Sequence, residues 1–205
     1  MCGRFFIGDP DDEWDEILSL LNRRAPIPGL KLSGEVFPTD LVPALAPGKS
    51  GRPSFYPMRW GYSLGESGKR IINARVETAA EKPMFLDGMR RRRCAVPASR
   101  YFEWTRKSAV KRKFSVRPEA GGLFYLAGLY RFESGLPVFT VLTRAPSESV
   151  AFLHDRMPVL LCPAYARRWV EPEADPWTLL PHALLQMECA PVSETPGKER
   201  PFLEF

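Results

Sequence analysis

Apolar residues near the start of the chain recur at the spacing of a helix. Four of them lie three or four positions apart and so share one helical face: Trp14, Ile17, Leu18 and Leu21. Asp9 and Pro10 provide an N-cap candidate and a first-turn proline, and the acidic residues at 11–13 suit the positive end of the helix dipole. The pattern predicts an amphipathic helix at this place.

Between residues 70 and 143 the pattern changes to short segments rich in β-branched and aromatic residues, which is typical of strands. Five segments carry it: 70–76, 94–104, 113–117, 123–132 and 138–143. Gly121-Gly122 and Ser134-Gly135 separate the later segments as turns do. We expect these segments to form the main sheet of the protein.

Outside this region the predicted elements are shorter. Proline and glycine interrupt the chain from Pro26 to Pro57, which predicts loops and short strands. Ser147 is placed to cap a helix running toward His154, and residues 165–170 predict another short helix. Because no repeat or linker divides the chain, we expect one α+β domain over residues 1–205. Its sheet is predicted to be mainly antiparallel and curled into a barrel-like form, with peripheral helices.

The charge balance permits a polyanionic partner without requiring one. The chain has 29 basic and 24 acidic residues, a formal net charge of +5. Basic residues gather at 90–93 and again between 106 and 113. Taken alone, each run is best interpreted as a solvated turn.

Cysteine usage and the start of the chain indicate a compartment. The four cysteines, at positions 2, 94, 162 and 189, are too few and too scattered for a disulfide framework or a close-spaced zinc site. The first ten residues lack the basic and apolar regions of a signal peptide, and apolar runs such as 157–162 are too short to cross a bilayer. We therefore expect a reduced, soluble, cytoplasmic protein, associated with the nucleoid if it is bacterial, with no membrane partner.

Cys2 is the first candidate for chemistry, because removal of Met1 would leave it with an α-amine. The resulting 1,2-aminothiol can form an imine with an aldehyde, and the thiol can then close a five-membered thiazolidine. Ordinary pKa values of about 7.7–8 for the amine and about 8.5 for the thiol leave both nucleophilic forms present at neutral pH. Ring closure is intramolecular and has a large effective concentration. On position alone, however, an incidental second residue is the better interpretation of Cys2.

Three polar residues further along stand in apolar surroundings: Asn73, Glu103 and His154. Strand alternation places Glu103 on the opposite face from Phe102 and Trp104. A carboxylate in an apolar setting and a histidine can both exchange protons near neutral pH, so a nucleophile, base and acid are available if they meet with Cys2. Taken singly, each also has a structural explanation: a strand-end amide, a surface ion pair and a hydrogen-bonded core histidine.

Seven sequence segments, which follow one another along the chain, favour the functional interpretation of these residues over the structural one. They are Met1-Cys2-Gly3-Arg4-Phe5, Trp60-Gly61, Asn73-Ala74-Arg75-Val76-Glu77-Thr78, Arg93-Cys94-Ala95-Val96-Pro97-Ala98, Tyr101-Phe102-Glu103-Trp104, Ala127-Gly128-Leu129 and His154-Asp155-Arg156-Met157-Pro158-Val159. This series resembles the SOS-response-associated peptidase (SRAP) family, whose members shield abasic sites in single-stranded DNA. The resemblance runs from residue 1 to about residue 170.

The resemblance implies a role for each candidate. Cys2 corresponds to the cross-linking nucleophile, and Asn73 to the asparagine that orients it and the opened sugar. Glu103 corresponds to the acidic residue that manages protons during imine formation and ring closure. His154 corresponds to the histidine that helps to open the deoxyribose to its aldehyde.

The resemblance also implies contacts with DNA. Arg4 and Arg75 resemble arginines that bind phosphates, and Trp60 resembles a tryptophan near the bases. Thr143 is a further candidate for a contact with the DNA backbone. One departure concerns Glu35, which stands where relatives often carry asparagine and where a carboxylate is awkward beside phosphate.

The expected partner is therefore single-stranded DNA with abasic sites, bound by a monomer that needs no metal or organic cofactor. An imine also permits a lyase side reaction. Two alternatives stay open: a cysteine peptidase or amino-terminal-nucleophile hydrolase, as the family name suggests, and a non-catalytic module that binds single-stranded DNA.

Overall fold

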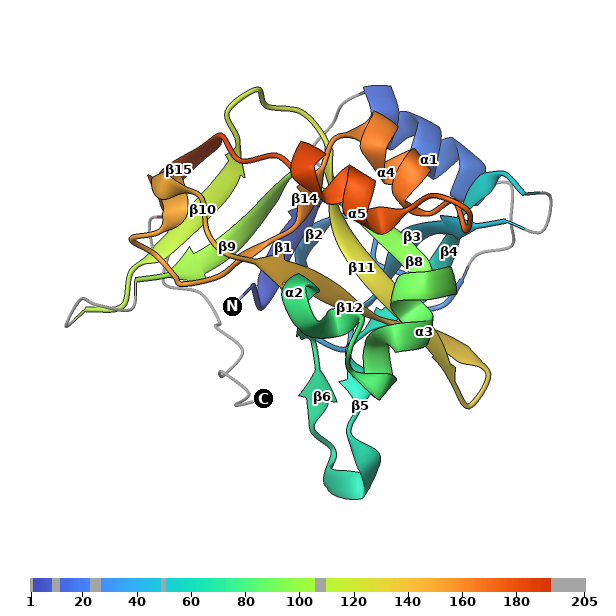
Figure 1. Cartoon of the computed structure of the whole chain (residues 1–205). Helices are drawn as coiled ribbons and strands as arrows, with labels where there is room; N and C mark the ends of the chain where they lie inside the picture. The colour runs from blue at the N-terminus through green and yellow to red at the C-terminus, as the bar shows by residue number, and fades with distance from the viewer. Residues whose placement is uncertain (1, 9–11, 23–26, 49–50, 106–109, 193–205) are drawn as a thin grey trace.

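The computed structural model of the chain describes residues 2–8, 12–22, 27–48, 51–105 and 110–192. Its largest element is a closed five-stranded barrel (Figure 1). The barrel strands are β3 (Leu41–Pro47), β4 (Pro53–Trp60), β8 (Arg93–Ala98), β11 (Phe124–Glu133) and β12 (Leu136–Arg144). Antiparallel pairs join β4 to β3, β3 to β8, β8 to β11 and β11 to β12, and a parallel pair of β12 with β4 closes the ring. The predicted barrel-like, mainly antiparallel sheet is confirmed.

Short strands extend the barrel at its margins. β7 (Asn73–Arg75) runs parallel to β12, while β13 (Met157–Pro158) and β14 (Leu160–Leu161) pair antiparallel with β12 and β11. A separate hairpin of β5 (Tyr62–Ser63) and β6 (Arg70–Ile71) projects from the lower end in Figure 1.

A second sheet of five antiparallel strands packs beside the barrel. Its order is β15 (Met187–Pro191), β10 (Lys113–Pro118), β9 (Arg100–Trp104), β1 (Arg4–Ile7) and β2 (Gly34–Val36). The chain passes from the barrel strand β8 to β9 at Ser99, whose amide donates to the carbonyl oxygen of Phe6 at 2.9 Å. A single cluster of buried apolar residues runs through both sheets.

The α-helices pack around the barrel (Figure 1). α1 (Asp12–Asn22) buries Trp14, Ile17 and Leu21, so the predicted helical face is confirmed, whereas the predicted cap at Asp9 and Pro10 lies outside the described residues. α4 (Pro163–Trp169) matches the helix predicted at 165–170. The remaining α-helices are α2 (Val76–Ala79), α3 (Pro83–Arg91) and α5 (Pro176–Leu179). No helix in the part of the chain that the structure describes is long and apolar enough to span a membrane.

Most predicted strands are present, with breaks that the pattern did not show. The segments 113–117, 123–132 and 138–143 became β10, β11 and β12, but 70–76 and 94–104 are each divided between two strands. Gly121, Gly122, Ser134 and Gly135 have positive φ, as tight turns require. The helix predicted from Ser147 is shorter than expected, because only the 3-10 turn η2 (Glu148–Val150) follows it.

Arg93 corrects the interpretation of the run at 90–93 as a solvated turn. It is only 2% exposed, because strand β8 carries its side chain under the ends of two helices. Its guanidinium donates to the carbonyl oxygens of Met89 at 2.7 Å, Trp169 at 2.7 Å and Ala174 at 2.8 Å. Burial lowers the pKa of Arg93. A buried charge surrounded by carbonyl acceptors supplies hydrogen bonds to the helix ends that pack there.

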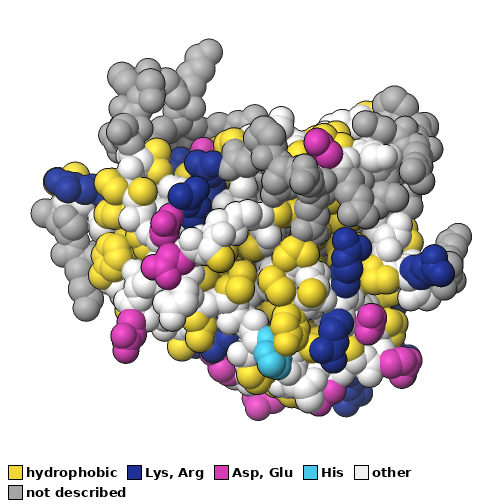
Figure 2. All heavy atoms as spheres, turned by 90° about the horizontal axis from the view of Figure 1, so that it is seen from above, with side chains coloured by type: hydrophobic (Ala, Val, Ile, Leu, Met, Phe, Trp, Pro, Cys, Tyr) yellow, Lys and Arg dark blue, Asp and Glu magenta, His cyan; other side chains and the backbone are white. Residues whose placement is uncertain are grey.

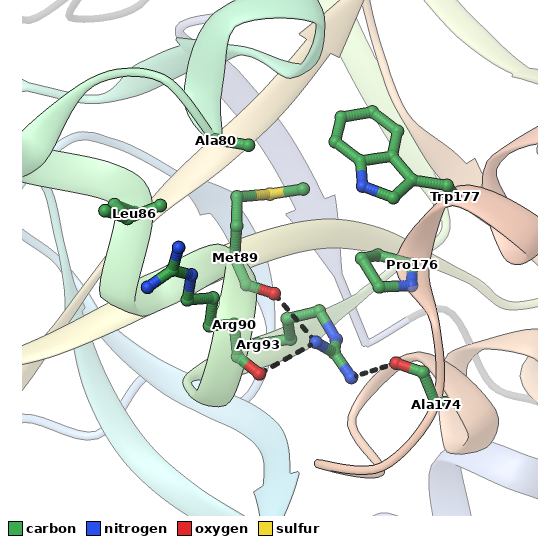
Figure 3. Close-up of a pocket in the computed structure, with 8 residues that line it drawn as sticks. All are labelled: Ala80, Leu86, Met89, Arg90, Arg93, Ala174, Pro176 and Trp177. Carbon is green, nitrogen blue, oxygen red and sulfur yellow. Dashed lines mark hydrogen bonds between the residues drawn. The ribbon is translucent and has the colours of Figure 1, made fainter.

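Figure 3 shows this cluster beside a cavity of about 280 Å³ between α3 and α5, with the ring of Trp177 at its edge. Dashed lines connect Arg93 to Met89, Arg90 and Ala174. None of the residues lining the cavity belongs to the predicted site. We therefore assign this region to the stability of the fold.

Replacing Arg93 by Met is expected to lower the free energy of unfolding by about 3–5 kcal/mol, because the helix-end carbonyl groups lose a buried charged donor. The exposed Arg91→Met variant serves as the control and should change it by no more than about 0.5 kcal/mol. Urea unfolding followed by circular dichroism measures both. Equal midpoints for the two variants would contradict the assigned role of Arg93.

Candidate functional site

The start of the chain is buried where the two sheets meet. β1 pairs with β9 so that Arg4 lies opposite Phe102 and Phe5 opposite Tyr101. Cys2, just before β1, has no exposed surface, and its Sγ lies 3.7 Å from the carbonyl oxygen of Arg4. Burial raises the pKa of the Cys2 thiol to about 12, and the nearby Glu103 carboxylate acts in the same direction. The thiol is therefore protonated at neutral pH.

Glu103 lies on the face of β9 that turns toward Cys2. It is 6% exposed and alternates with Phe102 and Trp104, as predicted. Tyr101 shares its face, and burial together with the neighbouring Cys2 thiol raises the pKa of Tyr101 well above its usual value. Tyr101 was not predicted as a site residue, although it lies two positions before Glu103 in the segment Tyr101-Phe102-Glu103-Trp104.

Asn73 connects the barrel to the start of the chain. β7 places it beside Val141 of β12, and its Nδ2 donates to the carbonyl oxygen of Cys2 at 2.9 Å. Its Oδ1 is buried and has no hydrogen-bond partner within the described ranges. A buried acceptor of this kind is costly unless a ligand or another group satisfies it.

His154 is buried on the loop that follows η2, with 5% exposure. The backbone N–H of Arg156 donates to its Nδ1 at 3.0 Å, while Oδ1 of Asp155 lies 2.6 Å from the same nitrogen. The first contact needs an unprotonated Nδ1 and the second a protonated one. Nδ1 can thus accept from Arg156 when the ring is neutral and donate to Asp155 when the ring is protonated, so the surroundings accommodate both states of the imidazole. The neutral ring then carries its proton on Nε2.

Arg156 fastens this loop to the barrel. Its guanidinium donates to both carboxylate oxygens of Glu77, at 2.8 and 2.6 Å, and to the carbonyl oxygen of Thr143 at 2.6 Å. The hydrogen bond from Arg156 lowers the pKa of Glu77. Because Glu77 lies in the first turn of α2, which follows β7 directly, the pair holds the His154 loop next to the end of β7. Arg156 was not predicted as a site residue, although it follows His154 in the same segment.

The structure therefore joins Asn73 to Cys2 by a hydrogen bond and places Glu103 close enough to influence the Cys2 thiol. His154 stands on the adjoining loop, attached through Arg156. Among the described residues, no group of three or more His, Cys, Asp or Glu side chains is placed to hold a metal ion.

The predicted phosphate contacts occupy two different settings. The Arg75 side chain is exposed at the end of β7. Arg4 is 8% exposed, with its guanidinium 4.7 Å from the ring centre of Phe37 and 5.0 Å from that of Trp104. Oε1 of Glu35 lies 3.6 Å from Arg4 Nη1.

Glu35 also pairs with Lys113 Nζ at 2.8 Å. The Glu35 carboxylate therefore lies between two cations and offsets one of their two positive charges. On the face shown in Figure 2, the basic side chains of the described residues lie in separate places among apolar and acidic ones.

Trp60 and Thr143 do not fit the contacts predicted for them. Trp60 has no exposed surface: its ring stacks on Phe139 at 6.1 Å, packs against Phe5 at 5.1 Å and donates through Nε1 to the carbonyl oxygen of Ile72. Thr143 is equally buried, and its Oγ1 donates to a backbone carbonyl group 3.3 Å away. Neither side chain can reach DNA in this structure, so we assign both to the core.

This constellation on a five-stranded barrel has known relatives, and the chain belongs to the SOS response associated peptidase (SRAP) family, whose model matches residues 1–198. The chain is 31% identical over 216 residues to the abasic site processing protein YobE of Bacillus subtilis, covering 94% of each. It is 35% identical over 122 residues to the abasic site processing protein YedK of Escherichia coli, covering 57% of this chain and 55% of that one.

Solved structures agree on the fold. The crystal structure of a phage-related protein from Bordetella bronchiseptica superimposes with a TM-score of 0.73 at 24% identity, covering 94% of this chain and 95% of that one. A second protein from the same organism gives a TM-score of 0.71 at 20% identity, covering 94% of this chain and 100% of that one.

In the chain that retains Met1, Cys2 is expected to resist alkylation by iodoacetamide at pH 7.5. A pKa of about 12 leaves a thiolate fraction on the order of 10⁻⁵ to 10⁻⁴. Peptide mass spectrometry should find the half-buried Cys162 modified at least about 100-fold faster in the native protein, with the difference lost in urea. Native Cys2 reacting as fast as Cys162 would show that its thiol is neither buried nor protonated.

Proposed function

We propose that the protein captures abasic sites in single-stranded DNA by a covalent bond to Cys2, after Met1 has been removed. The observation that carries this proposal is the meeting of Cys2 with Asn73 and Glu103 in a buried site. The relatives named above are abasic site processing proteins, which supports the same class of substrate.

The chemistry begins with the sugar. An abasic deoxyribose is a cyclic hemiacetal, and opening it requires a proton at the ring oxygen and loss of the proton of the C1′ hydroxyl group. His154 in its protonated form is the proposed general acid that supplies the first proton, and the neutral ring that remains can accept the proton of the hydroxyl group. The product is an aldehyde within reach of the terminal residue.

The two nucleophilic groups of Cys2 then act in order. The α-amine adds to the aldehyde carbon, and loss of water gives an imine. The thiol sulfur next bonds to the same carbon while its proton passes to the nitrogen, which closes the thiazolidine. A protonated thiol suits this order, because it leaves the first attack to the amine. Glu103, whose carboxylate lies near the Cys2 thiol, is the proposed carrier of the protons in these steps.

Asn73 and the arginines position the reactants. Asn73 Nδ2 holds the Cys2 carbonyl oxygen, and its buried Oδ1 can accept a hydrogen bond from the α-amine or from the opened sugar. The exposed Arg75 is the proposed phosphate contact nearest to Asn73. Phosphate contacts of this kind make affinity fall steeply with salt.

The peptidase alternative needs a different state of the same cysteine. A cysteine peptidase attacks through a thiolate that a neighbouring base or cation stabilises. Here burial and the Glu103 carboxylate both disfavour the thiolate. A non-catalytic module for single-stranded DNA would bind abasic and intact strands alike and would be indifferent to Cys2. Lyase cleavage through the imine is expected to be slow, because ring closure removes that intermediate.

Incubation with abasic single-stranded DNA is expected to give a retarded band on a denaturing gel, and intact DNA none. Without borohydride, Cys2→Ala should abolish the band. Cys2→Ala and Cys2→Ser both keep the α-amine, so each should form only an imine that borohydride traps. Glu103→Gln should slow adduct formation by roughly 100-fold or more, as loss of an acid–base group does.

Three outcomes are incompatible with the proposal. A wild-type protein that forms no adduct refutes covalent capture. A band that survives Cys2→Ala refutes the nucleophile. Equal stability of the Cys2→Ser and wild-type adducts without borohydride refutes ring closure.

A further inference from the structure

Phe152 is a large aromatic residue held at the rim of the site with most of its ring in solvent. It is 54% exposed and lies two positions before His154. The ring of Phe114 meets it edge to face, with centroids 5.6 Å apart and planes at 83°. This contact takes up one face or one edge of the Phe152 ring, and the rest stays accessible.

The backbone beneath Phe152 is fixed. The amides of Leu153 and His154 both donate to the carbonyl oxygen of Val150, which closes the turn around Phe152. Leu153 is 1% exposed and anchors the loop in the core. The ring is therefore presented by a structured turn, which lowers the entropy that a ligand must overcome on binding.

Phe114 connects the Phe152 ring to the sheet face that carries Glu103. In the pairing of β10 with β9, Phe114 lies directly opposite Glu103. Residues opposite each other on antiparallel strands project to the same face of the sheet. The aromatic pair therefore runs from the face that carries Glu103 to the loop that carries His154, and spans the rim between them.

An abasic nucleotide has no base of its own to stack, so any stacking on the protein must come from the bases of its flanking nucleotides. Stacking of a base on an aromatic ring tolerates any sequence. Trp60 cannot serve, because it is fully buried. Trp104 lies on the opposite face of β9 from Glu103, with the charged groups of Arg4 and Lys113 5.0 and 5.7 Å from its ring centre.

We propose that Phe152, supported by Phe114, is the stacking surface for a nucleobase next to the abasic site. This inference rests on the proposed function and adds a base-binding position to it.

The test measures the affinity of the full-length protein for an intact single-stranded oligonucleotide by fluorescence anisotropy. Phe152→Ala should weaken binding by roughly 5-fold to 150-fold, the range for loss of one stacked base. The matched control is Phe132→Ala. Phe132 is 57% exposed and meets Tyr130 edge to face at 6.0 Å, but it lies on the β11–β12 hairpin, far across the barrel from β10 (Figure 1). The control should bind like the wild type.

A second variant reports stacking directly. Phe152→Trp should retain affinity, and bound oligonucleotide should quench its added fluorescence, whereas Phe132→Trp should show no added quenching. The two tryptophan variants also test the stacking proposal if Phe152→Ala fails to fold. Wild-type affinity in Phe152→Ala, or an unquenched tryptophan at 152, would overturn the proposal.

The failure of this inference is distinguishable from failure of covalent capture. If Phe152 has no role, the wild type and Phe152→Ala will form adducts with abasic DNA at the same DNA concentrations. If covalent capture itself is wrong, the wild type will form no adduct at any concentration. If both proposals hold, Phe152→Ala will need more DNA but will reach the same final yield.

Discussion

The hydrogen bond from Asn73 Nδ2 to the carbonyl oxygen of Cys2 is the contact on which the proposed chemistry depends. Chain termini are usually poorly ordered unless something ties them down. Here β1 lies inside a sheet, between β2 and β9, and the hydrogen bond joins Cys2, two positions before β1, to a residue of β7 that lies 71 positions further along the chain. The first residues thus gain the fixed geometry that a reactive group requires.

The burial that orders Cys2 also determines its chemistry. Removing the thiol from water and placing it near a carboxylate disfavour its charged form, so the sulfur is a poor first nucleophile. In the proposed mechanism, an α-amine on the same residue supplies the first bond, and the sulfur is needed only after the aldehyde carbon is attached beside it. Asn73 and Glu103 come from different sheets, which meet because β8 continues into β9 at Ser99. The fold therefore assembles the site at the junction of its two sheets.

Part of this structure could be predicted from the sequence. The spacing of Trp14, Ile17 and Leu21 predicted α1, because helical periodicity reports directly which face is buried. Alternation around Glu103 predicted its face for the same kind of reason. That Cys2, Asn73 and Glu103 meet could be expected only from the family resemblance, since spacing along the chain does not say which strands pair.

The errors have physical causes. Trp60 in the core and a tryptophan that stacks on bases have the same local sequence, and only the packing of Phe5 and Phe139 distinguishes them. In the sequence, Arg93 cannot be distinguished from the other arginines of its run. Only the packing of the helix ends against it, with hydrogen bonds to their carbonyl oxygens, makes it a buried residue. Phe152 stands alone in a loop, where no periodicity marks it, and its place at the site depends on the pairing of Phe114 with Glu103.

The most direct measurement of the central claim is the intact mass of the protein after reaction with an abasic oligonucleotide, under denaturing conditions. Two forms are compared: one that begins at Cys2, and one in which a lysine inserted before Cys2 prevents removal of Met1. The first form should gain the mass of the oligonucleotide less one water, as condensation to a thiazolidine requires. The second should gain nothing, because its thiol has no neighbouring amine. Equal adducts from both forms would contradict the account.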